Sequence, residues 1–170
     1  MTYRPISDYG VIGDMHSAAL VSTSGSIDWL CFPRFDSASV FAAILDDQRG
    51  GRFAIRPTGE YRSSQAYMPD TNILVTTFHT DGGGRVTVTD FMPLAEDITL
   101  SEHEIIRVAR CEAGEVTLEC LFRPRLDYAR VDTHLTGAPK GVLATAGSER
   151  LSLASPVPTR AAECMSPMTP

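Results

Sequence analysis

The densest group of side chains able to bind a polar ligand lies near the N-terminus. Trp29, Arg34, Phe35 and Asp36 follow one another closely. An aromatic face can stack on the apolar face of a sugar ring, and a guanidinium can bridge hydroxyl groups. We therefore take these four residues as candidates for lining a sugar site. The structural alternatives are that Trp29 is a buried core residue, and that Arg34 pairs with Asp36 or with Asp28.

Four aspartates are the candidate catalytic carboxylates. Glycoside hydrolysis usually needs two carboxyl groups across the scissile bond, one a proton donor with a raised pKa and one a base or nucleophile. The aspartates that come into question are Asp14, Asp28, Asp36 and Asp90. Their neighbours in the sequence give them ordinary positions at turns, caps and strand ends. We predict no catalytic pair in this chain.

Metal-binding and redox patterns are weak. The histidines are scattered, at His16, His79, His103 and His134. No His-Glu-x-x-His or His-x-His spacing links them, so we expect no metal site and no cofactor. We expect residues 102–104, a Glu-His-Glu triplet, to be solvated surface, because adjacent strand residues point to opposite faces. The cysteines form no Cys-x-x-Cys pair and are found at Cys31, Cys111, Cys120 and Cys164. We predict buried free thiols.

The composition fits a folded domain. The chain has 170 residues, of which 43% are hydrophobic and 21% charged, and this is enough to bury a core. The net charge of −6 argues against nucleic acid or an anionic membrane as partner. No apolar run is long enough to span a bilayer, and the first residues do not resemble a signal peptide. We expect a cytoplasmic protein.

The hydrophobic pattern predicts strands and hairpins. Residues 18–22 and 27–32 form two strands around Ser24-Gly25, and residues 73–80 and 85–91 form a hairpin whose turn is the glycine run 81–84. In residues 116–122 apolar and polar side chains alternate with period two, which indicates one half-buried face.

Two more hairpins complete the predicted sheet pattern. One joins residues 104–111 to 116–122, and the other joins 141–145 to 150–154. Hairpins at this spacing, with almost no helix, indicate an antiparallel β-sandwich. One short helix is predicted near residues 37–45, where apolar side chains share a helical face. The four prolines of residues 155–170 predict an irregular tail.

The run from Asp8 to Asp46 resembles the N-terminal domain of glycoside hydrolase family 15, the glucoamylase- and trehalase-like enzymes. Residues 71–93 and 122–128 resemble further blocks of that domain, in the same order. The resemblance covers residue 6 to about residue 154. It implies a mainly β, possibly incomplete sandwich domain over residues 1–154, followed by the irregular tail.

The resemblance also implies where catalysis resides. In that family the paired carboxylates lie in a helical barrel C-terminal to this domain, and this sequence stops before it. We therefore expect a truncated, non-catalytic product that braces the barrel, in cis or in trans. Its candidate substrate-lining residues at an α-glucoside pocket are Trp29, Arg34, Phe35 and Asp36. The alternative is a stand-alone carbohydrate-binding or interaction module.

Overall fold

The computed structural model describes residues 3–94, 103–157 and 166–168. Strands dominate these residues, and the helical segments among them are two single 3₁₀ turns, η1 (Ile6–Asp8) and η3 (Asp127–Ala129). The predicted mainly β class is therefore confirmed. None of the helices in these ranges has the length and apolar character needed to cross a membrane.

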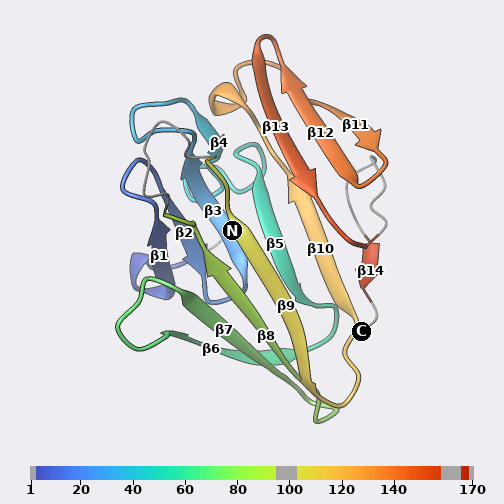
Figure 1. The fold of residues 1–170 in the computed structure, drawn as a ribbon. Helices are drawn as coiled ribbons and strands as arrows, with labels where there is room; N and C mark the ends of the chain where they lie inside the picture. The colour runs from blue at the N-terminus through green and yellow to red at the C-terminus, as the bar shows by residue number, and fades with distance from the viewer. Residues whose placement is uncertain (1–2, 95–102, 158–165, 169–170) are drawn as a thin grey trace.

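The strands form three antiparallel sheets, shown in Figure 1. The large sheet has the order β1-β2-β3-β5-β10-β14, and β4 pairs with β3. Its strands are β1 (Tyr9–Gly13), β2 (Ala18–Ser22), β3 (Ser26–Cys31), β4 (Ser39–Phe41), β5 (Arg52–Pro57), β10 (Leu118–Arg123) and β14 (Ser166–Met168). The four-stranded sheet contains β6 (Tyr61–Tyr67), β7 (Leu74–Thr80), β8 (Arg85–Phe91) and β9 (Ile106–Ala113). The three-stranded sheet contains β11 (His134–Ala138), β12 (Gly141–Ala146) and β13 (Glu149–Ala154).

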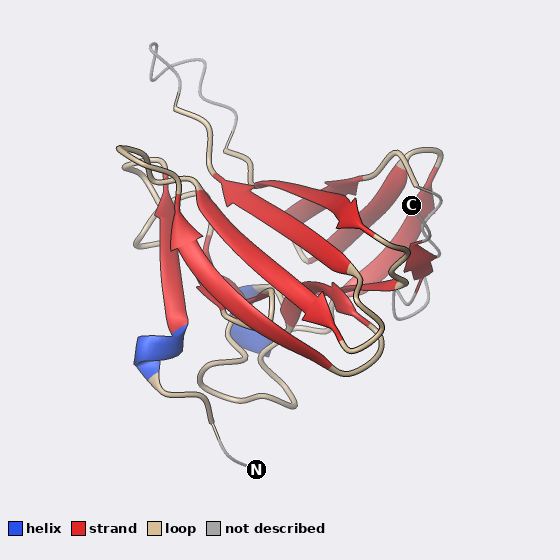
Figure 2. Cartoon of the chain, turned by 90° about the horizontal axis from the view of Figure 1, so that it is seen from below, coloured by secondary structure: helices blue, strands red, loops and turns tan. Residues whose placement is uncertain are grey.

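The main core lies between the large sheet and the four-stranded sheet, which form the two layers of a sandwich (Figures 1 and 2). Ile27 and Phe53 of the large sheet and Phe78 of the four-stranded sheet are all buried in it. The layers approach closely at Gly10, where an added Cβ would lie only 2.6 Å from the Leu74 side chain. The antiparallel sandwich predicted from the two-residue periodicity is therefore present, with a third sheet beside it.

Two predicted hairpins are confirmed. β7 and β8 pair around residues 81–84, and β12 and β13 pair around Gly147. Each reversal contains a glycine in the left-handed region, with φ of +81° at Gly83 and +58° at Gly147, and glycine adopts this conformation without steric cost. The predicted pairing of β2 with β3 also forms.

The predicted hairpin between residues 104–111 and 116–122 is wrong. β9 pairs with β8 in the four-stranded sheet, whereas β10 pairs with β5 in the large sheet. The chain passes from one layer to the other near Gly114, where φ is +68°. An alternating pattern shows which face of a strand is buried but does not select its partner strand, so it is the same in both arrangements.

The short helix predicted near residues 37–45 is also wrong. β4 forms there instead and pairs with β3, so that Val40 and Phe41 reach the core from a strand. The Ala42 N–H then donates to the Gly50 carbonyl at 2.7 Å, which closes the following residues into a loop. Strand pairing therefore buries Val40 and Phe41, whereas Leu45, on the following turn, is 65% exposed.

The predicted irregular tail, residues 155–170, contains one short strand. β14 pairs antiparallel with β10, with Met168 opposite Leu118. Residues 158–165 and 169–170 lie outside the described residues. β10 therefore has partners on both sides, β5 and β14.

The cysteine prediction holds for two positions. Cys31 and Cys120 are buried free thiols, which pack as small apolar side chains. Cys111 is also a free thiol but is only half-buried, and it lies in a different sheet from Cys120. Cys164 lies outside the described residues.

A buried arginine of the four-stranded sheet joins the two layers. Arg107 on β9 donates from Nε to Asp90 Oδ1 at 2.8 Å, and the two side chains are only 2% and 0% exposed. The same guanidinium donates to the main-chain carbonyls of Phe53 and Gly25 in the opposite layer, at 2.7 and 2.8 Å. It also lies 4.7 Å over the Phe53 ring. One arginine of the four-stranded sheet therefore satisfies acceptors in both layers.

We expect Arg107→Ala to lower the free energy of unfolding by about 3–5 kcal/mol, because it leaves the Asp90 carboxylate buried without its partner. The control is Arg34→Ala, which removes an exposed ion pair worth at most about 1 kcal/mol. Urea unfolding measures both variants. Similar small losses in the two would contradict the role given to Arg107.

Phe122→Ala tests the core. The predicted burial of Leu118 and Phe122 is confirmed, and the Phe122 ring packs edge-to-face on Phe53 and Phe41, with centroids 5.4 and 6.1 Å away. We expect a loss of about 3–5 kcal/mol of unfolding free energy. Phe35→Ala, at a 63% exposed phenylalanine, should change it by no more than about 0.5 kcal/mol. Chemical denaturation measures the free energy of unfolding of both variants. A loss below about 1 kcal/mol for Phe122→Ala would contradict the prediction.

Candidate functional site

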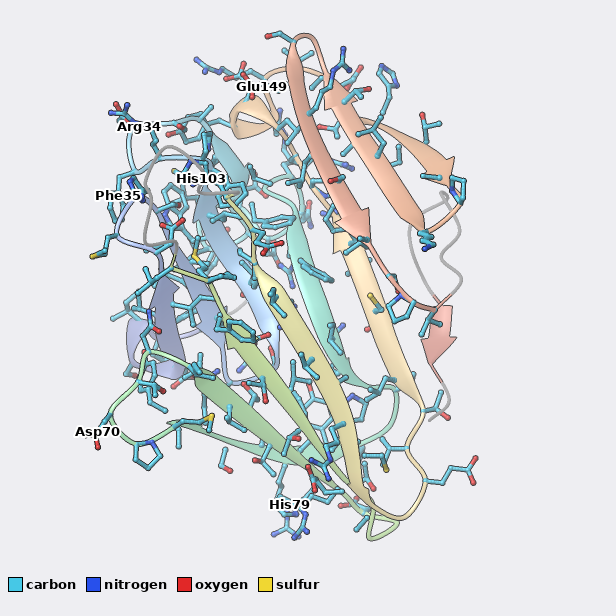
Figure 3. The ribbon with its side chains drawn as sticks, viewed as in Figure 1. Arg34, Phe35, Asp70, His79, His103 and Glu149 are labelled. Atoms are coloured by element: carbon cyan, nitrogen blue, oxygen red, sulfur yellow. The ribbon has the colours of Figure 1, made fainter. Side chains whose placement is uncertain are left out.

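The predicted site residues Arg34, Phe35 and Asp36 lie together in the loop between β3 and β4. Figure 3 shows Arg34 and Phe35 on this loop at the upper left of the view. Arg34 Nε donates to Asp36 Oδ1 at 3.0 Å, and both side chains are largely exposed. Of the two pairings considered for Arg34, the one with Asp36 is formed. The Phe35 N–H donates to the His16 carbonyl at 2.8 Å, which ties this loop to the β1–β2 connection.

Trp29 lies on β3, on the face of the large sheet that points away from the core. Its cross-strand partner is Leu20, whereas the adjacent pair of Ala19 and Leu30 points into the core and is buried. Trp29 is partly exposed. It is therefore not one of the residues that fill the space between the layers, as the core alternative required.

A β-bulge between β2 and β3 brings Asp28 onto the same outer face as Trp29. The Asp28 carboxylate accepts hydrogen bonds from Ser26 Oγ at 2.6 Å and from the Tyr9 hydroxyl at 3.0 Å, and Arg52 Nε lies 3.8 Å away. Burial and the neighbouring Asp28 carboxylate raise the pKa of Tyr9 far above its usual range. The Tyr9 phenol therefore remains a donor to Asp28 at neutral pH.

A polar cluster beside the Arg34 loop has no signature in the sequence. The His103 ring centroid lies 5.6 Å from that of His16 and 6.0 Å from that of Phe32. His103 Nδ1 is 3.4 Å from Asp14 Oδ2, although the two residues are 89 positions apart. His103, expected to lie on a solvated surface, is instead partly buried in this cluster, with 26% of its side chain exposed. Only the long-range pairing of the fold brings His103 to Asp14.

Asp14 organises this cluster from a buried position. Its Oδ1 accepts hydrogen bonds from the main-chain N–H groups of Ser17, at 2.7 Å, and His16, at 2.9 Å. Burial by itself would raise the pKa of Asp14, but these hydrogen bonds and the neighbouring His103 outweigh it and hold the pKa below its ordinary value. The carboxylate therefore fixes the β1–β2 turn, in which Met15 has a φ of +70°.

The four aspartates considered as catalytic groups occupy four different environments. Asp14 closes a turn, Asp28 belongs to the Tyr9 network, Asp36 pairs with Arg34 at the surface, and Asp90 is buried against Arg107. Within the described ranges, no three His, Cys, Asp or Glu side chains gather closely enough to hold a metal ion. The exposed loop offers an aromatic ring, a donor and an acceptor, which suit contact with a sugar or a protein.

Comparison with known protein families assigns the chain to a family. The sequence model of the family described as "Trehalase-like, N-terminal" matches residues 2–160. A mainly β sandwich is also the fold that the resemblance implied. The chain belongs to the trehalase-like N-terminal domain family, which confirms the similarity first noted in residues 8–46.

Curated relatives show how much of a longer protein this domain represents. A trehalase of Thermoplasma volcanium is 34% identical over 160 residues, which cover 93% of this chain and 26% of that protein. Trehalase 1 of Sulfolobus acidocaldarius is 39% identical, with 88% and 25% covered, and a trehalase of Mycolicibacterium smegmatis is 37% identical, with 76% and 21% covered. The chain thus spans a fifth to a quarter of the length of these relatives. No solved structure matches it.

Asp14→Asn tests the electrostatics of the turn. We expect it to cost about 1–2 kcal/mol at neutral pH, because a neutral amide is a weaker acceptor for the two N–H donors. The folded-state pKa of Asp14 lies below its unfolded value of about 3.9, so its stabilisation is complete above that pH and is lost as the pH falls through the folded-state pKa. The difference between wild type and variant in urea unfolding should therefore shrink in acid. A pH-independent difference would contradict this account.

Proposed function

We propose that this chain is the non-catalytic N-terminal β-sandwich of a trehalase- or glucoamylase-like glycoside hydrolase of family 15. In this role it braces the catalytic helical barrel and lines one edge of the α-glucoside pocket. The observation that carries the proposal is the extent of the match. The family domain fills residues 2–160, yet the chain corresponds to only a fifth to a quarter of each relative named trehalase.

The Arg34 loop supports the pocket-lining part of the proposal. It presents the Arg34 guanidinium and the Asp36 carboxylate side by side, so that a donor and an acceptor are available to neighbouring sugar hydroxyls. Phe35 adds an exposed aromatic face, and its N–H bond to His16 orders the loop before any ligand arrives. Trp29, the fourth candidate residue, lies outside this loop, on the adjoining strand β3 and on the outer face of the large sheet.

We also propose that the protein is cytoplasmic. Cys31, Cys111 and Cys120 are all free thiols. Proteins of reducing compartments keep their cysteines in this form, whereas small secreted domains commonly oxidise them to disulfides.

The lone chain should release no glucose from trehalose, maltose or starch above a buffer blank, because hydrolysis needs two carboxyl groups roughly 5–10 Å apart across the scissile bond. Activity should appear in a chimera in which this chain replaces the matching region of the Thermoplasma volcanium trehalase. The same trehalase with that region deleted is the control, and we expect it to be inactive or unstable. Turnover by the lone chain that Asp14→Asn, Asp28→Asn or Asp36→Asn abolishes would overturn the proposal.

A stand-alone carbohydrate-binding module is the second candidate, and the partly exposed Trp29 on the outer face favours it. Trp29 is the only tryptophan, so any fluorescence change on adding sugar reports on this residue. A saturable change with trehalose, maltose or maltooligosaccharides, absent with cellobiose, would support this role. Flat signals with every sugar would remove it.

A further inference from the structure

The outer face of the large sheet carries an apolar row that the sandwich core does not use. Val11, Leu20 and Trp29 are cross-strand partners on β1, β2 and β3, and we call them the outer row. The adjacent inward-facing row is buried and consists of Ile12, Ala19 and Leu30. An antiparallel sheet with one face in water normally carries polar side chains on that face. The outer row therefore needs an explanation other than the core.

Further apolar groups lie beside the outer row. The Ile44 N–H donates to the Asp28 carbonyl at 3.1 Å, which holds the loop after β4 alongside β3. The Tyr3 hydroxyl donates to the Leu45 carbonyl at 3.3 Å. Val11, Leu45 and Tyr3 are 47%, 65% and 53% exposed. Contiguous apolar patches mark contact surfaces, whereas singly exposed apolar residues are normal for a monomer, so we treat the outer row with the Leu45 and Tyr3 side chains as a candidate contact surface.

The free edge of β1 is closed to a partner strand. The Tyr67 hydroxyl accepts from the Val11 N–H at 2.8 Å and donates to the Val11 carbonyl at 2.9 Å. Asn72 donates to the Gly13 carbonyl at 2.8 Å. These side chains occupy main-chain groups that an added strand would need. A partner strand is therefore excluded at this edge, and a partner of the outer row would pack on its side chains. The helical barrel of the proposed function would offer a helix face for such packing.

The polar groups bordering the outer row are compatible with burial. The Asp28 carboxylate already has Tyr9 and Ser26 as hydrogen-bond donors and Arg52 as its countercharge. A covering partner would therefore not leave the Asp28 carboxylate unpaired, and an unpaired buried charge is the main cost of covering such a group.

We propose that the outer row, together with Leu45 and Tyr3, is the surface on which the remainder of a trehalase-like protein docks, through an apolar helix face. The inference rests on the proposed function and specifies its interface. In the relatives from Thermoplasma volcanium and Sulfolobus acidocaldarius, about three quarters of the length lies outside the match. Contacts between domains of one chain typically bury about 600–1,500 Å². A second copy of this chain is the weaker occupant, because each copy carries a net charge of −6.

The test compares aspartate substitutions on the two outer faces of the sandwich in the Thermoplasma volcanium chimera. Val11→Asp and Leu45→Asp place a charge in the proposed interface. Val108→Asp is the matched control, since Val108 is 49% exposed and lies on β9, one of the two edge strands of the four-stranded sheet. Each variant is made in the lone chain and in the chimera. Thermal unfolding is measured for both, and trehalose hydrolysis for the chimera.

We expect all three variants of the lone chain to unfold within a few degrees of wild type, because exposed substitutions change stability little. In the chimera, Val11→Asp and Leu45→Asp should reduce hydrolysis at least about tenfold or lower the unfolding temperature, whereas Val108→Asp should not. If all three variants behave alike in an active chimera, the docking surface is refuted and the proposed function stands. If the wild-type chimera is inactive, and this chain and the remainder of the trehalase unfold independently within it, the docking surface and the proposed function are both refuted.

Discussion

The buried Arg107–Asp90 ion pair is the interaction on which the sandwich most depends. The two residues are direct cross-strand partners on β9 and β8, and neither has more than 2% of its side chain exposed. Such a pair persists inside a protein only when its remaining hydrogen-bonding groups are satisfied. The carbonyls of Phe53 and Gly25 do this, and they belong to the opposite layer. The electrostatic requirement of one arginine thus fixes the position of one sheet over the other.

This constraint separates the two faces of the large sheet. With β9 held over β5, the chain passes Gly114 and enters the large sheet as β10, so the inner face is covered by the chain's own four-stranded layer. The bulge between β2 and β3 turns Asp28 and Trp29 together toward the outer face. The inner face is therefore covered by the chain's own second sheet. The outer face combines apolar residues with the hydrogen-bonded network around Asp28.

Local features of this fold could be predicted from the sequence, and long-range ones could not. The β7–β8 hairpin was predictable because the glycines within residues 81–84 can adopt the positive φ angles that a tight reversal needs. Gly114 lies in the connection of the predicted hairpin between residues 104–111 and 116–122, but it carries the chain from one layer to the other. The apolar pattern that includes Val40 and Phe41 fits a helix as well as the strand that forms. The Arg34–Asp36 pair follows from proximity in the chain, whereas the Asp14–His103 contact spans 89 residues and depends on the finished fold.

Trp29 shows why an outer apolar surface is hard to recognise in a sequence. Leu20-Val21 and Trp29-Leu30 are consecutive apolar pairs, so β2 and β3 are apolar on both faces. Such strands are typical of sheets covered on both sides. Here the four-stranded sheet covers the inner face, and Val11 on the outer row is left 47% exposed. Leaving such a row in water costs hydrophobic free energy, and this cost is the physical basis of the docking surface that we propose.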